Sequence, residues 1–149
     1  MTAMVTMAHG DYDQLQLKTD WPTPQLKQGE VLIKTHRSLI STGTEMMLYG
    51  DTAKPNTVWK EMSHYPRLTG YSNVGEVIEV GIDVDTKWLG KRVHNHGKHQ
   101  LYTTTTVQKL AEVPKSVLSE EATFASLGKV AMNSIRRGNV IWGETIAVV

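Results

Sequence analysis

Three histidines lie close together in the sequence, and imidazole is a common metal ligand. His94, His96 and His99 form the pattern H-x-H-x-x-H. In an extended strand, residues 94 and 96 share a face, so two imidazoles could reach one metal ion. Asn95 and Gly97 favour a loop instead, in which the histidines have no common ligand. We expect the loop and no bound metal.

The chain contains no cysteine, which limits its chemistry. Disulfides, thiolate-ligated zinc and a cysteine nucleophile are all excluded. Sixteen Lys+Arg against fifteen Asp+Glu leave a net charge of +1, which gives no electrostatic case for nucleic acid or a membrane surface. No apolar stretch reaches the roughly 20 residues that span a bilayer. The N-terminus lacks the pattern of a signal peptide, so we expect a cytoplasmic protein.

The first 113 residues predict a mainly β structure. Short strands separated by turn residues are expected at 4–8, 15–17, 31–38, 73–80, 92–93 and 101–107. Many short strands with glycine turns favour a barrel-like body. Gly75 interrupts the strand at 73–80 and indicates a bulge or a close backbone approach. A short helix is expected around 58–62.

The pattern changes after Pro114. Ser119 is a candidate N-cap, and apolar residues then recur at helical spacing until Gly138. The final residues, G-E-T-I-A-V-V at 143–149, predict a buried strand of a parallel sheet. In a dinucleotide-binding unit such a strand leads into G-x-G-x-x-G, which this sequence lacks. We expect a barrel domain at 1–118, and at 119–149 a junction helix with the first strand of an absent dinucleotide-binding domain.

Several segments, in this order, resemble the medium-chain dehydrogenase/reductase superfamily. They are G-E-V-L-I-K at 29–34, P-R-L-T-G at 66–70, G-E-V-I-E-V-G at 75–81, G-K-R-V at 90–93, E-V-P at 112–114, S-E-E-A at 119–122 and G-E-T at 143–145. The resemblance covers nearly the whole chain. It implies a GroES-like, partly open β-barrel with a C-terminal helix and one leftover Rossmann-type strand. NAD(P) is the cofactor that it implies for the full-length family.

The sequence departs from the zinc-dependent members at both ligand positions. The zinc-dependent members carry the motif C-G-x-C-G-[ST]-D at the place where this chain has S-T-G-T-E at 41–45. By this resemblance Ser41 takes the place of a ligand cysteine. Their G-H-E is replaced by Gly70-Tyr71-Ser72. A serine hydroxyl is a poor zinc ligand beside thiolate or imidazole. The S-T-G-T-E string is similar to a zinc-independent branch, so we expect no zinc.

The resemblance also implies a cleft that faces the nicotinamide. By that likeness Ser41, Thr44 and Tyr71 are the candidate catalytic residues. With zinc absent, hydroxyls such as that of Tyr71 would polarise or protonate a carbonyl. Thr42, Glu45 and Lys129 are candidate cofactor-binding residues if a nucleotide-binding domain is supplied. The alternative is structural: a turn with a capping hydroxyl starts a helix at 42–45, and Tyr71 only packs.

Two functions follow as hypotheses. The chain is either the catalytic-domain fragment of a zinc-independent NAD(P)-dependent oxidoreductase, inactive alone, or a stand-alone GroES-like assembly module. The second hypothesis predicts a homodimer joined through residues 119–149, because a helix and strand without a partner domain leave apolar surface exposed. A separate nucleotide-binding polypeptide is a third arrangement. The sequence contains no group diagnostic of a substrate.

Overall fold

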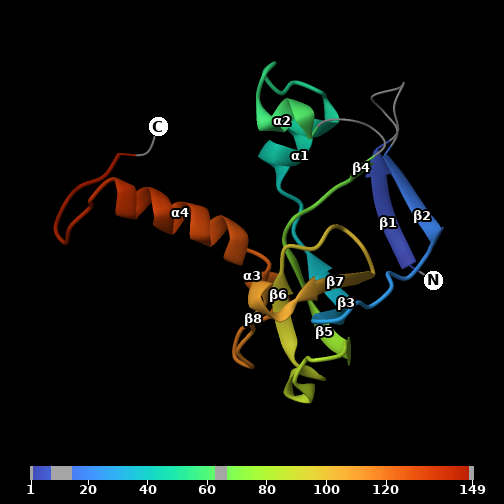
Figure 1. The fold of residues 1–149 in the computed structure, drawn as a ribbon. Helices are drawn as coiled ribbons and strands as arrows, with labels where there is room; N and C mark the ends of the chain where they lie inside the picture. Colours follow the sequence, from blue (N-terminus) through green and yellow to red (C-terminus); the bar gives the residue numbers. More distant parts are fainter. Residues whose placement is uncertain (1, 8–14, 63–66, 148–149) are drawn as a thin grey trace.

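The computed structural model describes residues 2–7, 15–62 and 67–147, with the backbone alone described for residues 2–7. Its strands form two antiparallel sheets (Figure 1). The strands are β1 (Thr2–Met7), β2 (Leu15–Trp21), β3 (Glu30–Ser38), β4 (Arg67–Leu68), β5 (Asn73–Val80), β6 (Arg92–Asn95), β7 (Tyr102–Thr106) and β8 (Ala111–Glu112). One sheet has the order β2-β1-β4 and the other β7-β3-β5-β6-β8. The mainly β prediction is confirmed, although β4 and β8 were not predicted, and Ala8, the last residue of the first expected strand, lies outside the described residues.

The core lies in the five-stranded sheet. Val31 and Ile33 of β3, Val77 of β5 and Val93 of β6 are fully buried against one another. Burying each such side chain stabilises the fold by about 1.5–3 kcal/mol before packing differences are considered. These β-branched residues fit a pleated surface, which is why their segments form strands. The core therefore fixes β3, β5 and β6, the strands whose ends carry the polar residues described below.

Gly75 marks a close approach between β5 and β3, as the sequence predicts. A Cβ atom on Gly75 would lie 2.3 Å from the backbone oxygen of Lys34. The register of the two strands shifts nearby, between the pairs formed by Thr35 and Arg37. Only a residue without a side chain allows this contact.

Two helices connect β3 to β4. They are α1 (Thr42–Tyr49) and α2 (Val58–Glu61), and α2 confirms the helix expected around 58–62. α1 begins at Thr42 with Ser41 as its N-cap residue, but the Ser41 hydroxyl makes no capping bond. The Glu45 carboxylate instead accepts a hydrogen bond from the backbone N–H of Ser41, at 2.8 Å. The expected helix-starting turn is therefore present, and the Glu45 carboxylate satisfies the backbone N–H of its N-cap residue, although the predicted capping hydroxyl bond is not formed.

The predicted C-terminal helix is divided in two. α3 (Ser119–Ala122) is followed by α4 (Ala125–Arg137), which runs through Gly128 and ends at Gly138. The N-cap is Leu118, one residue before the predicted Ser119. At the division, Thr123 is buried and its backbone oxygen accepts a hydrogen bond from the hydroxyl of Ser72, at 2.6 Å. This contact ties the start of α4 to the sheet, while the rest of α4 extends away from it (Figure 1).

The strand expected at the end of the chain is not formed in residues 144–147. An isolated extended segment leaves its backbone groups without ladder partners, so a strand needs a neighbour with which to pair. No described strand pairs with these residues. Residues 148–149 lie outside the described residues.

In the described part of the chain, every helix is too short or too polar to cross a membrane.

Candidate functional site

The structure brings together two of the three predicted catalytic residues. Ser41 precedes α1, and Tyr71 follows Gly70 after β4. The Tyr71 hydroxyl donates a hydrogen bond to the Ser41 Oγ, at 2.6 Å, and both residues are half-buried. Thirty residues separate them in the sequence. We call these two side chains the hydroxyl pair.

The other predicted residues of 41–45 differ in position. Thr42 is exposed, and Thr44 is half-buried in the first turn of α1.

The alignment of the zinc motif with this sequence needs a correction in register. When C-G-[ST]-D is aligned on Gly43, Thr44 and Glu45, its cysteine corresponds to Thr42 rather than to Ser41. Both residues offer a neutral hydroxyl, so the donor set remains a poor match for zinc.

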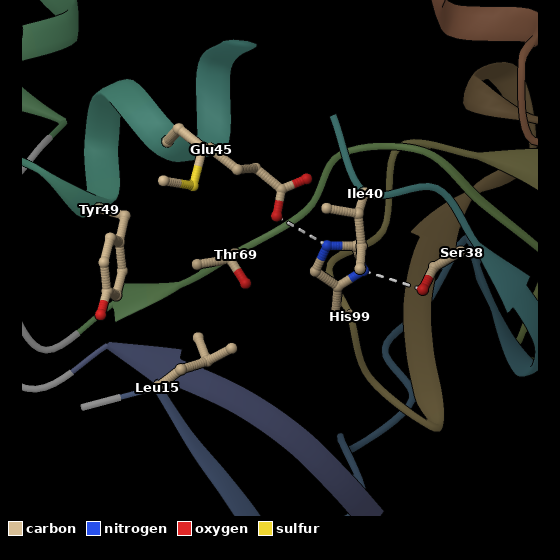
Figure 2. A pocket seen from close by; sticks show the side chains of 8 residues that line it. Leu15, Ser38, Ile40, Glu45, Tyr49, Thr69 and His99 are labelled. Atoms are coloured by element: carbon tan, nitrogen blue, oxygen red, sulfur yellow. Dashed lines mark hydrogen bonds and ion pairs between the residues drawn. The ribbon is translucent and has the colours of Figure 1, made fainter. Parts of the chain in front are cut away.

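Glu45 connects the hydroxyl pair to a second polar group. One carboxylate oxygen accepts from the Ser41 N–H, and the other lies 2.9 Å from His99 Nε2. The other nitrogen of His99, Nδ1, lies 2.8 Å from the Ser38 Oγ (Figure 2). An ionised carboxylate can only accept, so Nε2 carries a proton. Nδ1 accepts the Ser38 hydroxyl proton when the ring is neutral and donates to the Ser38 Oγ when the ring is protonated. The result is a continuous carboxylate–imidazole–hydroxyl chain.

Sequence reasoning missed this chain of contacts. The sequence indicates Glu45 only as a candidate cofactor-binding residue, and it predicts neither the pairing of Glu45 with His99 nor the contact of His99 with Ser38. His99 lies 54 residues from Glu45 and 61 from Ser38. No local pattern signals a pair at such separations.

Gly70 lies close to the ring of His99. Its φ of +87° lies in the left-handed region that favours glycine, and a Cβ there would lie 2.9 Å from ring atoms of His99. The close contact between this backbone and the imidazole leaves no room for a larger residue. Gly70 therefore sets the position of the ring as well as the turn that leads to Tyr71.

A cavity of about 310 Å³ opens beside Glu45 and His99. Figure 2 shows the side chains around it, which come from β2, the end of β3 and the residues that lead into α1, α1 itself, the segment after β4, and the segment between β6 and β7. They are Leu15, Ser38, Ile40, Glu45, Met46, Tyr49, Thr69 and His99. Apolar walls with a few fixed polar groups are typical of small-molecule sites. Three of these lining residues, Glu45, Met46 and Tyr49, belong to α1.

The ionised form of Glu45 is favoured in this setting. Burial raises the pKa of a carboxyl group, but the hydrogen bonds from His99 and the Ser41 N–H and the positive charges of His99 and Lys98 outweigh it. The pKa of Glu45 therefore lies below its ordinary value of 4.5. The carboxylate stays available as an acceptor at neutral pH.

Replacing Glu45 with glutamine tests this linkage. We expect E45Q to destabilise the fold at neutral pH by about 1–3 kcal/mol, because hydrogen bonds to a charged group are lost. A carboxyl whose folded pKa is depressed contributes stability above its unfolded pKa, and that contribution is lost as pH falls through the folded pKa. The difference between wild type and E45Q should therefore shrink below pH 4.5. Urea unfolding across this pH range measures it.

Glu61→Gln, at an exposed carboxylate in α2, is the matched control. It should change the stability little at any pH. A difference between E45Q and wild type that stays constant from neutral pH into acid would contradict the assigned ionisation.

The three histidines of the H-x-H-x-x-H pattern do not converge on one point. His99 belongs to the Glu45 chain, whereas His94 and His96 lie together with ring centroids 5.6 Å apart. The Ser126 hydroxyl lies between them, 3.3 Å from His94 Nε2 and 3.4 Å from His96 Nδ1. Among the residues that the structure describes, no group of three or more His, Cys, Asp or Glu is placed to hold a metal ion.

Lys129 is separated from the other two candidate cofactor-binding residues. It lies on α4 and lines a second cavity with His94 and His96. Thr42 and Glu45 belong to α1, and neither lines that second cavity. The backbone oxygen of Tyr71 lies 3.2 Å from His96 Nδ1, so Tyr71 stands between the hydroxyl pair and this second group.

Known proteins similar to this chain in sequence are oxidoreductases. A mitochondrial NAD(P)H oxidoreductase of Dictyostelium discoideum is 28% identical over 132 residues, which cover 83% of this chain and 36% of that protein. An L-threonine 3-dehydrogenase of Pectobacterium carotovorum is 32% identical over 82 residues, covering 52% of this chain and 21% of the dehydrogenase. The chain thus spans about a third of the first relative and about a fifth of the second. No protein-family profile matches it.

Solved structures with the same fold include further oxidoreductases. The quinone oxidoreductase from Coxiella burnetii superposes with a TM-score of 0.79 at 22% identity, covering 96% of this chain and 47% of that one. A mycobacterial protein complexed with NADPH gives 0.69 at 22% identity, covering 97% and 42%. At these identities the likeness shows a common fold. Together the comparisons support the resemblance of this chain to the medium-chain dehydrogenase/reductase superfamily.

Proposed function

We propose that this chain supplies the substrate side of a zinc-independent, NAD(P)-dependent oxidoreductase that interconverts a carbonyl and an alcohol or reduces a quinone. The observation that carries the proposal is the hydroxyl pair, Tyr71 OH to Ser41 Oγ at 2.6 Å, with the Ser41 backbone fixed by Glu45. The neutral donors at this place suit a carbonyl oxygen better than a zinc ion.

The described residues offer a place for the substrate of such a reaction. The hydroxyl pair offers hydroxyl groups to a small carbonyl compound. The cavity of about 310 Å³ is not lined by Ser41 or Tyr71, but Glu45, which binds the Ser41 N–H, is one of its lining residues, so we propose that the organic part of the substrate enters there. The 149 residues contain no G-x-G-x-x-G to hold a pyrophosphate. Under this proposal, residues outside these 149 hold the nucleotide. We propose residues 1–118 as a GroES-like barrel domain and 119–149 as its junction with a nucleotide-binding domain.

Each residue has a separate part in the proposed reaction. A bound nicotinamide supplies the hydride. When substrate binds, the Tyr71 hydroxyl turns its one proton from Ser41 to the substrate oxygen, and the Ser41 hydroxyl then donates to the tyrosine oxygen. Tyr71 transfers that proton to the substrate oxygen, or receives one in the direction of oxidation. Ser41 holds the tyrosine hydroxyl in position, and Glu45 fixes the backbone of Ser41 while His99 holds Glu45. Ile40 and Met46 offer apolar surface to the organic part of the substrate.

The experiment that tests this function is NAD(P)H oxidation by the protein as its gene encodes it, including any residues that follow Val149. Quinones, aldehydes and ketones are offered as substrates with and without a metal chelator. We expect turnover that the chelator does not reduce, and no turnover by residues 1–149 alone. Turnover that the chelator abolishes would contradict the zinc-independent site.

A second candidate function, a self-assembling module, is favoured by the surface of α4. The exposed large apolar side chains on α4 and after it are Leu127, Val130, Met132, Ile135, Ile141, Trp142 and Ile146. Clusters of exposed apolar side chains commonly mark interaction surfaces. We propose a second copy of this chain as the occupant of this surface.

Light scattering across a concentration series tests the dimer. We expect a homodimer that Val130→Glu and Ile135→Glu convert to a monomer, while Ile82→Glu, at an exposed site far from α4 in the sequence, leaves the dimer intact. A chain that stays monomeric at the highest concentration would rule out self-assembly.

A further inference from the structure

A second cavity, of about 410 Å³, lies between the five-stranded sheet and the start of α4. Figure 1 shows α3 and the first turn of α4 beside β6 and β8. The lining residues are His94, His96, Gln108, Lys109, Leu110, Ala111, Ala125, Ser126 and Lys129. Their polar groups are two imidazoles, two lysine ammonium groups, an amide and a hydroxyl. All of these can donate hydrogen bonds.

The lining contains two cationic side chains and no carboxylate. Neither Lys109 nor Lys129 forms an ion pair with a described residue. Nearby acidic residues are paired elsewhere. Glu112 binds Lys91 at 2.7 Å, and Glu120 binds Arg37 at 2.7 Å. The cavity therefore has uncompensated positive charge.

The two histidines are held in fixed positions at the cavity wall. His94 is 7% exposed, and its Nε2 lies 2.9 Å from the Ser72 Oγ and 3.3 Å from the Ser126 Oγ. Burial and then the neighbouring His96 lower the pKa of His94. The surroundings thus disfavour the protonated form of His94. A bound anion would offset that effect.

We propose that this cavity binds the phosphoryl group of a small phosphorylated molecule. A phosphoryl group has up to three acceptor oxygens and about two negative charges, which match several donors around one point better than a carboxylate does. Leu110, Ala111 and Ala125 offer apolar surface to the organic part of the ligand. The volume exceeds that of a phosphate ion and falls in the range of small-molecule pockets, about 300–1,000 Å³. The site does not depend on the proposed oxidoreductase function.

The test follows the imidazole NMR signals of His94 and His96 in phosphate-free buffer. The probes are inorganic phosphate, adenosine monophosphate and adenosine. We expect saturable shifts of both histidines with the first two probes, tighter binding of the monophosphate, and no saturable shift with adenosine. Equal shifts with adenosine, or none with either phosphate, would overturn the proposal.

Substitutions locate the site independently of these signals. Lys109→Gln and Lys129→Gln should each weaken binding of adenosine monophosphate by about fivefold, the upper range for exposed charge interactions. Lys115→Gln removes an exposed lysine outside the cavity and should leave the affinity unchanged. Circular dichroism confirms that each variant is folded. If the variant that carries both Lys109→Gln and Lys129→Gln bound adenosine monophosphate as tightly as wild type, the assignment would be overturned.

Discussion

Replacing Tyr71 with phenylalanine is expected to lower kcat for carbonyl reduction by about 10²- to 10⁴-fold, the usual contribution of a positioned proton donor. The substitution removes only the hydroxyl that donates to Ser41, at 2.6 Å. One lost hydrogen bond changes the free energy of unfolding by about 1 kcal/mol, so the variant should remain folded. Steady-state kinetics of the protein as its gene encodes it measure the effect.

Two other variants separate proton donation from packing. Ser41→Ala removes the acceptor of the Tyr71 hydroxyl and should lower kcat less than Y71F, because the donor itself remains. Tyr102→Phe removes a hydroxyl from β7, where Tyr102 is paired with Lys34, and should leave kcat unchanged. A Y71F enzyme that keeps wild-type kcat would show that Tyr71 only packs.

Placing an alanine at Gly75 is expected to cause the largest loss of stability. The new Cβ would lie 2.3 Å from the backbone oxygen of Lys34 and 2.7 Å from Ile33 Cγ2. The obstructing strand β3 is paired on both sides, with β5 and β7, so it cannot move without breaking a ladder. We expect a destabilisation of about 3 kcal/mol or more, at or above the upper end for overpacked cores. Urea and thermal unfolding measure it.

Gly43→Ala is the matched control for this substitution. Gly43 lies in α1, and a Cβ there would meet nothing within 4 Å. Because alanine favours a helix more than glycine does, G43A should stabilise the protein by up to about 1 kcal/mol. A G75A variant as stable as wild type would mean that β3 and β5 are not in the close contact described.

Much of the fold could be predicted because its strongest signals are local. The apolar run at Val31–Ile33 and the glycine in β5 identified strands that form the core. α1 was recognised only as a turn, because its first residues, Thr42, Gly43 and Thr44, are poor helix formers. The strand expected within 143–149 is not formed in its described residues, for a different reason. Its apolar composition fits a sheet, but strand formation depends on a partner.

The candidate site could be predicted only in part. The family resemblance placed Ser41 and Tyr71 in one cleft, and the structure brings their hydroxyls into contact. The family resemblance also grouped Lys129 with Glu45 as cofactor-binding residues, although the two line different cavities. The contact between Glu45 and His99 depends on how α1 folds over the segment after β6. Tertiary packing determines that arrangement, and no short spacing encodes it.

The central claim, that the hydroxyl pair serves a zinc-independent oxidoreductase, is tested most directly by one measurement. It is the rate of NAD(P)H oxidation with carbonyl and quinone substrates, in the presence of a chelator, for wild type and Y71F of the protein as encoded. The account predicts turnover by wild type that resists the chelator and falls by at least about 10²-fold in Y71F. Wild-type turnover that the chelator abolishes, or that is unchanged in Y71F, would contradict it.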